Sequence, residues 1–405
     1  MGSRSTYLRS RRCSTMGFYL PWPFAAEMVP ICAAAICAFL VMPLLTTRAR
    51  YWEKEPVCAG PQNVHIEPTS RLGGVAVFLA YVVAVTLAFK LEHMPLRLAF
   101  PLLISALPVV VVGLWEDIAR RVSPGKRLLA AVGSAALASA IAQGYITRLD
   151  LPVVDGWLAY LPFAVPLTWF MVAGACNAIN LIDGNHGLAG GTAVLMFFGM
   201  AMVAEHAGDE LVLWQALGMV GALIGFLLWN YPHGRVFLGD AGAYFIGFMY
   251  AQLSIQLITQ NAGISAWFVI ALTAYPIAET LFSMYRRIIV RRVASMQPDA
   301  QHLHSLLYLH CLRFAERRRR GDRRACNVQE SFPGIEPSGS GRLANARVAP
   351  RLWLHSSLCL VTALVFHDDT AVLIGFIIVY AIYYIFCYRK AVRVSAIPSA
   401  QPSRT

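Results

Sequence analysis

Long apolar blocks alternate with short polar segments along most of the chain. Residues 73–89, 96–115 and 236–257 carry few charges, and each approaches the roughly 20 residues that a helix needs to cross about 30 Å of hydrocarbon. Backbone polar groups inside a bilayer must pair within their own segment, so each block is expected to be a helix. The fold class is therefore predicted to be an all-α polytopic membrane protein. The pattern predicts eleven transmembrane spans, at residues 22–44, 73–89, 96–115, 128–144, 157–176, 187–204, 211–229, 236–257, 264–282, 352–366 and 371–388.

Basic side chains are divided unequally between the alternate loops that these spans define. Of the lysines and arginines, 27 fall in one set of loops and only Lys90, Arg97 and Arg148 in the other. Cytoplasmic loops carry an excess of Lys and Arg, so the basic loops are predicted to be cytoplasmic. The arginine-containing stub at residues 1–21 is the exception, which indicates either a miscounted span or a native start at Met16.

The composition narrows the class of protein further. Hydrophobic residues make up 57% of the chain and charged residues 14%, which excludes an ordinary soluble enzyme, a disordered chain and a secreted disulfide scaffold. The basic loops explain the net charge of +12, so nucleic-acid binding is not expected, and the nine cysteines show no zinc-type spacing. The predicted organisation is a basic stub at 1–21, a transmembrane catalytic region at 22–304, a basic Gly/Ser/Pro-rich cytoplasmic loop at 305–351, two final helices at 352–388 and a cytoplasmic tail at 389–405.

The polar clusters that interrupt the apolar pattern all fall in loops predicted to be cytoplasmic. Glu116 and Asp117 close the third span, where they either pair with arginines four residues later or offer carboxylate oxygens to Mg²⁺ or a base to a phosphate. Asn177, Asn180 and Asp183 lie three apart and form one polar stripe, which serves either as glue between helices or as a binding surface. Ionisable groups at the ends of membrane spans are costly, so we expect a functional site here.

The segment at residues 230–242 carries the strongest local signal. Pro232 and Gly234 are expected to break a helix, and a new span is expected to start near Val236. Asp240 would then lie about one turn inside an apolar segment. Its desolvation is favourable only beside a partner, and a divalent cation is the simplest one.

His302 and His304 follow in a later cytoplasmic loop. No further Cys or His lies at ligand spacing, so a phosphate contact or proton transfer explains them better than zinc. Carboxylates, amides, imidazoles and arginines on one membrane face suit Mg²⁺-assisted chemistry on a phosphorylated substrate.

Five segments resemble, in order and in spacing, the motifs of the polyprenyl-phosphate N-acetylhexosamine-1-phosphate transferases, the glycosyltransferase 4 family. The resemblance runs from about Arg48 to His304, through VHIEPTSRLGGVAVF, GLWEDIARRVSPGKRLL, NAINLIDGNHGLAGG, NYPHGRVFLGDAGAYFIGF and PDAQHLHSLLY. It implies transfer of a sugar 1-phosphate, N-acetylhexosamine 1-phosphate in the family, from a UDP-sugar to polyprenyl (undecaprenyl) phosphate with release of UMP. This is the first membrane step of O-antigen or similar cell-surface glycan synthesis, and Mg²⁺, with Mn²⁺ as the alternative, is the implied cofactor.

The resemblance also implies roles for single residues. Asp240 matches the Mg²⁺-binding aspartate of the family, with Asp183 assisting it and Asp117 orienting or deprotonating the lipid phosphate. The remaining implied roles are Phe237 and Asn230 in the nucleotide pocket, His302 and His304 as catalytic histidines near the diphosphate, Arg71 at a phosphate, and Asn177, Asn180 and His186 as further substrate contacts.

Three positions depart from the family pattern. The acidic pair reads Glu116–Asp117 where two aspartates are usual, which makes Glu116 the less important catalytic candidate of the two. His186 stands where the family has the second aspartate of DGxDGLA, and Ser305 replaces the last histidine of HxHH. The change at His186 bears on contacts with the nucleotide or the sugar.

Other functions stay open at this stage. Within the family, the alternative is a phospho-N-acetylmuramoyl-pentapeptide transferase of peptidoglycan synthesis. Outside it, Asp117 and Asp240 could form the dyad of an intramembrane aspartyl protease, and a transporter would place its charges near mid-membrane. The expected partners are a UDP-sugar donor and a polyprenyl phosphate acceptor, and a homodimer is compatible with the sequence. The expected location is the bacterial inner (cytoplasmic) membrane, with the active site facing the cytoplasm.

Overall fold

The computed structural model describes residues 28–52, 69–142, 144–290, 301–321 and 344–395, and these residues are almost entirely helical. Within them there is no strand, and one isolated bridge joins Ser70 to Val236. The helices are α1 (Met28–Trp52), α2 (Gly73–Lys90), α3 (Leu96–Ala119), α4 (Pro124–Ile141), α5 (Pro152–Leu158), α6 (Leu161–Ile182), α7 (Leu188–Ala207), α8 (Glu210–Asn230), α9 (Gly239–Gln260), α10 (Ala266–Leu272), α11 (Ala274–Tyr285), the π-helix η1 (Arg286–Val290), α12 (Leu303–Gly321), α14 (Val348–Val365) and α15 (Thr370–Ser395).

The helices long and apolar enough to cross a membrane confirm a multi-pass membrane protein. In the described residues nine helices meet that test, and a tenth span results if α10 and the following helix, bent by 75° relative to each other, count as one. The block expected at 128–144 is helical as α4, but Lys126 and Arg127 in its first turn make it too polar for the same test. The predicted count of eleven is therefore not confirmed.

Two predicted segments differ in detail from the structure. The first part of the predicted loop at 305–351 is helical, because α12 extends to Gly321. The predicted stub at 1–21, the centre of that loop at 322–343 and the tail beyond Ser395 lie outside the described residues.

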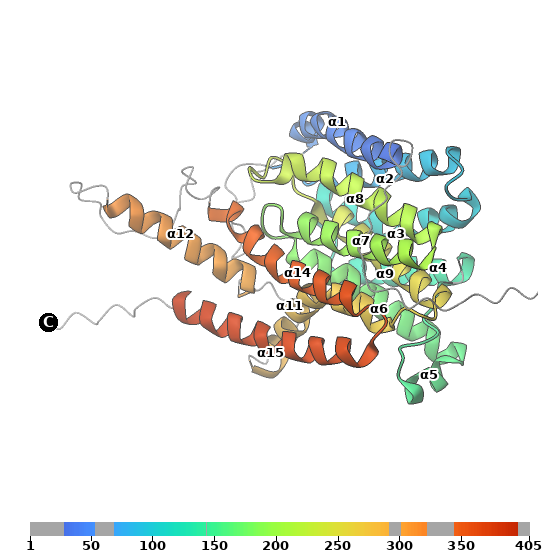
Figure 1. Cartoon of the computed structure of the whole chain (residues 1–405). Coiled ribbons are helices and arrows are strands. Elements are labelled where there is room, and N and C mark those ends of the chain that lie inside the picture. The colour runs from blue at the N-terminus through green and yellow to red at the C-terminus, as the bar shows by residue number, and fades with distance from the viewer. Residues whose placement is uncertain (1–27, 53–68, 143, 291–300, 322–343, 396–405) are drawn as a thin grey trace, which may run out of the picture.

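Helix α9 lies at the centre of the bundle. The membrane-spanning part of α9 is 94% buried inside the protein, whereas that of the peripheral α15 is 17% buried. Helix α9 packs against α2, α3, α4, α6, α7 and α8. Figure 1 shows α12 and the C-terminal part of α15 extending from one end of the bundle, with α5 at the other end. We call these the motif end, which carries Asp117, Asp183, Asp240 and the start of α12, and the opposite end, which carries α5 and the C-terminus of α9.

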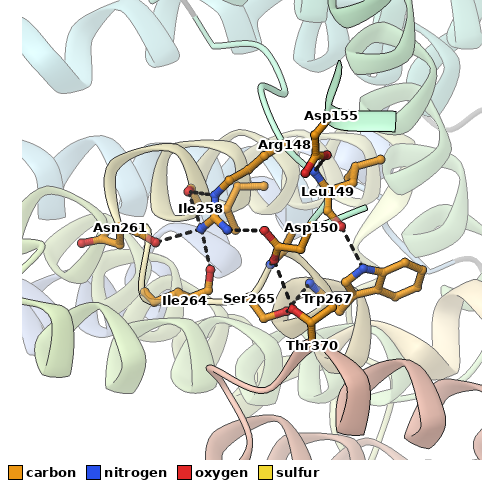
Figure 2. Close-up of polar contacts among 11 residues, drawn as sticks. Arg148, Leu149, Asp150, Asp155, Ile258, Asn261, Ile264, Ser265, Trp267 and Thr370 are labelled. Carbon is orange, nitrogen blue, oxygen red and sulfur yellow. Dashed lines mark hydrogen bonds and ion pairs between the residues drawn. The ribbon is translucent and has the colours of Figure 1, made fainter. Parts of the chain in front are cut away.

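The opposite end is held by a charged network around Arg148 (Figure 2). The guanidinium of Arg148 donates to the carbonyl oxygens of Ile258, Asn261 and Ile264, at 2.6–3.1 Å, and forms an ion pair with Asp150. Asp150 also accepts from the backbone N–H of Ala266 at 2.6 Å, so one ion pair joins the end of α9 to the start of α10. Because cations favour helix C-termini, Arg148 is well placed to cap α9.

Candidate active site

The first and fourth motif segments meet at the motif end through their backbones. Phe237 donates its N–H to the Ser70 carbonyl at 2.8 Å, and Gly73 and Gly74 donate theirs to the carbonyls of Phe237 and Leu238 at 3.0 and 2.8 Å. A side chain on Gly74 would lie 2.1 Å from the backbone nitrogen of Gly242, so only glycine permits this approach. The Gly-Gly pair therefore presses the start of α2 against the start of α9.

Helix α9 begins with two acidic side chains around its free backbone amides. Gly239 opens the helix at φ = +73°, and its N–H faces the carboxyl group of Asp183. Asp117, only 2% exposed, accepts from the N–H groups of Asp240 and Ala241 at 2.8 and 2.9 Å. Negative groups are stabilised at a helix N-terminus, and both oxygens of Asp117 are engaged in this way. Asp117 thus joins α3 to the start of α9.

Asp240 lies in the first turn of α9, one residue after Gly239. The sequence placed it about one turn further inside, because the break at Pro232 continues as a turn up to Leu238 before the helix starts. Asn180 donates its amide Nδ2–H to Oδ1 of Asp240 at 2.9 Å, and Arg127 forms an ion pair with Oδ2. Arg127, from the first turn of α4, is therefore the cation paired with this carboxylate.

Asp183 directly follows the last residue of α6 and lies close to the carboxylate of Asp240. Burial, reinforced by the negative charge of Asp240, raises the pKa of Asp183 to about 7, while the half-buried Arg71 and the Gly239 amide act in the opposite direction. Asp183 and Asp240 lie close together and face an arginine, which indicates a place for further positive charge. Perturbed groups of this kind cluster at functional sites.

His302 and His304 stack beside this acidic cluster. Their rings are parallel, with centroids 5.2 Å apart, and a side chain on Gly184 would lie 2.9 Å from Nε2 of His304. Burial lowers the pKa of His304 to about 4, so this ring is neutral at physiological pH. The buried Glu279 accepts from Nδ1 of His302 at 3.1 Å.

The predicted nucleotide-pocket residues lie together, although two of them serve the framework. Asn230 accepts from the Gly187 N–H at 2.6 Å and donates to the Val236 carbonyl at 2.7 Å, so it ties α8 to the start of α7. His186 is 1% exposed, and its ring lies 5.9 Å from that of the half-buried Phe237. Phe237 is the least buried member of this group.

The structure separates the remaining predicted residues. Glu116 accepts from the Val122 N–H at 2.7 Å and so closes the turn after α3, with Arg127 near its charge. Asn177 lies half-buried one turn before Asn180 on α6. The described residues do not include Asp299 or the basic side chains between residues 53 and 68.

Two residues of the site were not singled out by the sequence. Arg127 was counted among the basic loops, and no local pattern distinguishes it from its neighbour Lys126. Glu279 lies inside a span, and an ionisable residue there is a functional signal by itself. That signal was available from the sequence and was missed.

The donor set at the motif end fits a hard divalent cation. Mg²⁺ uses one or two carboxylates and completes its octahedron with water and substrate phosphates. Asp240 and Asp183 supply two carboxylates, and Asn180 holds Asp240 in place. Among the described residues no three His, Cys, Asp or Glu side chains are grouped so that they could hold a metal ion by themselves.

Comparison with known proteins agrees with the motifs. The family model for glycosyl transferase family 4 matches residues 99–258. A probable undecaprenyl-phosphate N-acetylglucosaminyl 1-phosphate transferase of Bacillus subtilis (strain 168) is 30% identical over 293 residues, which cover 69% of this chain and 78% of that protein. A decaprenyl-phosphate N-acetylglucosaminephosphotransferase of Mycobacterium tuberculosis is 29% identical over 286 residues, covering 61% of this chain and 67% of that protein.

A relative with another name matches over a shorter region. The phospho-N-acetylmuramoyl-pentapeptide-transferase of Bacillus cytotoxicus is 30% identical over 200 residues, covering 47% of this chain and 61% of that protein. The extent of the Bacillus subtilis match, together with the five ordered motifs, establishes the family. The chain belongs to glycosyl transferase family 4, the polyprenyl-phosphate N-acetylhexosamine-1-phosphate transferases, and is a membrane-embedded enzyme of the phosphotransferase class.

Proposed function

We propose that this enzyme transfers N-acetylglucosamine 1-phosphate from its UDP derivative to polyprenyl phosphate and releases UMP, at the cytoplasmic face of a bacterial inner membrane. The observation that supports this most is the convergence of Asp183, Asp240, Arg127 and the histidine pair at one end of the bundle. The name of the Bacillus subtilis relative supports the choice of sugar and of lipid. The excess of basic loops at the same end supports the orientation.

The reaction is a single displacement at phosphorus. An oxygen of the lipid phosphate forms a bond to the β-phosphorus of the donor, and the bond from that phosphorus to the oxygen bridging it to the α-phosphate breaks. UMP leaves with both electrons of the broken bond. A phosphate monoester has a second pKa near 6, so most of the lipid phosphate is already dianionic at about pH 7 and needs little base assistance.

The residues at the motif end would neutralise the charge of the donor diphosphate and hold the reacting groups in position. Mg²⁺, bound at Asp240 with Asp183, would supply positive charge to the diphosphate and the leaving UMP. Arg71 and Arg127 lie close enough to these carboxylates to contact donor phosphates once substrate enters. His302 and His304 stack beside the acidic cluster and would contact the diphosphate.

Asp117 takes a different role in this proposal from the one its motif implied. A base for the lipid phosphate must reach it, and Asp117 is only 2% exposed, with both oxygens directed at backbone N–H groups of α9. We therefore assign Asp117 to positioning Asp240. The half-exposed Glu116 and bulk water are then left as proton acceptors.

Release of UMP by the purified protein tests the proposal. In detergent or nanodiscs, the wild type is given UDP-N-acetylglucosamine, undecaprenyl phosphate and Mg²⁺, and UMP and the lipid-linked sugar are both quantified. Formation of the two products in equal amounts supports the proposal. Absence of both, with a folded protein and a chelator-sensitive control enzyme active in the same mixture, contradicts it.

A second donor has support from the comparisons. The Bacillus cytotoxicus relative is named for a muramoyl-pentapeptide donor. The longer match to the N-acetylglucosaminyl relative, over 69% of this chain against 47%, favours the N-acetylglucosamine donor. Parallel assays with UDP-N-acetylglucosamine, UDP-N-acetylgalactosamine and UDP-N-acetylmuramoyl-pentapeptide decide between them by kcat/KM. Family membership removes the intramembrane protease and the transporter as explanations of the acidic pair.

A further inference from the structure

A buried carboxylate that the family motifs do not include lies directly behind the histidine pair. Glu279 is on α11, immediately after the 75° bend that follows α10, and its side chain is 1% exposed. Its Oε1 accepts from Nδ1 of His302 at 3.1 Å and from the backbone N–H of Leu303 at 3.0 Å. One oxygen therefore joins α11 both to an imidazole and to the first residue of α12.

The contacts of His302 select a single tautomer. On its other side, Nε2 lies 3.4 Å from the Nη2 of Arg287. A guanidinium can only donate, so Nε2 must accept, and the ring proton is on Nδ1, from which it is donated to Glu279. A carboxylate behind a histidine fixes its tautomer and its ring orientation in many catalytic sites.

The same carboxylate controls where His304 lies. Leu303, whose N–H binds Glu279, separates the two histidines in the chain, and the two stacked rings are parallel to within 1°. His304 packs over Gly184, next to Asp183. A change in the Glu279 contacts would therefore move both rings relative to the acidic cluster.

We propose that Glu279 is a positioning residue for the sugar-phosphate transfer, which sets the tautomer of His302 and anchors the start of α12 so that both histidines face the acidic cluster. This rests on the proposed function, because the histidines matter only if a diphosphate reacts beside them. Glu279 itself does not touch substrate. Its effect is transmitted through His302.

A double-mutant cycle tests this with the full-length protein in nanodiscs. Glu279→Gln keeps the size of the side chain and removes its charge, and we expect it to lower kcat about 10- to 100-fold, the usual range for partners that orient a functional histidine. In a His302→Gln background the same change should cost about twofold or less, because the residue it acts through is gone. Equal losses in both backgrounds would show that Glu279 only supports the fold and would overturn the proposal.

A matched variant controls for the loss of a carboxylate as such. Glu210 is exposed in the first turn of α8, at the opposite end of the bundle. Glu210→Gln should leave kcat within about twofold of wild type, as surface substitutions usually do. A comparable loss in this variant would mean that the Glu279 effect is not specific and would overturn the proposal.

The ¹⁵N chemical shifts of His302 in the wild-type protein give a readout that does not depend on activity. The expected spectrum has a protonated Nδ1 and an unprotonated Nε2, identified by loss of the assigned signals in His302→Gln. The opposite tautomer overturns the proposal, even if Glu279→Gln fails to fold. If wild type releases no UMP with any donor but shows the expected tautomer, the proposed function fails while the Glu279–His302 geometry stands.

Discussion

Charged side chains occupy both ends of the bundle, and both ends use a terminus of α9. At the opposite end, Arg148 donates to carbonyls at the C-terminus of this helix, as Figure 2 shows. At the motif end, Asp117 accepts from the amides at its N-terminus. Each charge has the sign that the helix dipole favours, so placement on the dipole does not distinguish the two ends.

The difference lies in how the carboxylates are neutralised. At the opposite end Asp150 receives Arg148, the Ala266 N–H and the Thr370 hydroxyl, so its charge is matched within the protein. At the motif end Asp183 and Asp240 lie close together, and the pKa of Asp183 rises to about 7. A matched network stabilises the fold, whereas the three carboxylates of Asp117, Asp183 and Asp240, which share Arg71 and Arg127, are suited to binding a further cation or a substrate.

The largest effect is expected at Asp240. Asp240→Asn should lower kcat about 10²- to 10³-fold, which is typical for removing one electrostatic contributor to the transition state. The melting temperature should change little, because the repulsion with Asp183 is relieved while the ion pair with Arg127 is lost. UMP release and thermal unfolding in detergent measure the two quantities.

Asp150→Asn is the matched control at the opposite end. It should keep kcat within about twofold of wild type when assayed well below its melting temperature. Full activity of Asp240→Asn, or an equal loss in both variants, would mean that the two acidic sites do not differ as described.

The next effect concerns stability at the opposite end. Arg148→Met leaves Asp150 without its ion pair and removes the guanidinium donor from the carbonyls of Ile258 and Ile264, while the Asn261 carbonyl keeps the Ile264 N–H. We expect the free energy of unfolding to fall by about 2 to 3 kcal/mol, since hydrogen bonds to charged groups contribute most of what is lost. Thermal unfolding followed by circular dichroism checks this, with Arg97→Met as a control. If Arg148→Met protein that is still folded lost kcat, Arg148 would have a role in catalysis as well as in stabilising the fold, which would contradict this prediction.

The helices were predictable from the sequence because membrane spans are set by composition. Apolar blocks near the length of a bilayer mark every helix of 18 or more residues except α12, whose arginine-rich second half was predicted as loop. In α4, Lys126 and Arg127 extend the helix beyond its apolar part. The bend between α10 and α11 was not predictable, because the run at 264–282 is apolar on both sides of it. Arg148 appeared as one of three exceptions to the charge rule, and only the position of the α9 carbonyls explains it.

The site was predictable as a set of residues but not as a set of contacts. Motif spacing named Asp183, Asp240 and the histidines, and the structure brings them together. The position of Asp117 depends on where α3 meets α9, which no local pattern encodes. Arg127 lies 113 residues from Asp240 in the chain, so their pairing depends on tertiary packing alone.

Removing Arg127 should change the Mg²⁺ concentration needed for activity. This effect is expected to be smaller than those at Asp240 and Arg148. Its guanidinium pairs with the carboxylate that we propose for Mg²⁺, so the two cations compete for Asp240. Arg127→Gln should lower the Mg²⁺ concentration for half-maximal activity about three- to tenfold, which corresponds to roughly 1 kcal/mol. Titration of UMP release with Mg²⁺ measures it, with the exposed Arg121→Gln as control. A higher Mg²⁺ requirement would show that Arg127 assists the metal site instead of competing with it.

The smallest effect is expected where the chain departs from its family, at His186. Nδ1 of this buried ring lies 3.0 Å from the Pro232 carbonyl oxygen, and the ring packs near Phe237. His186→Asp restores the family residue but cannot donate to Pro232, so the turn that carries Phe237 should loosen. We expect the KM for the UDP-sugar to rise about threefold with kcat unchanged, the size of one neutral hydrogen bond. His186→Asn keeps a donor and should retain the wild-type KM. If both variants match wild type across the donor panel, His186 has no part in donor binding, and the aspartate of its relatives is replaceable here without consequence.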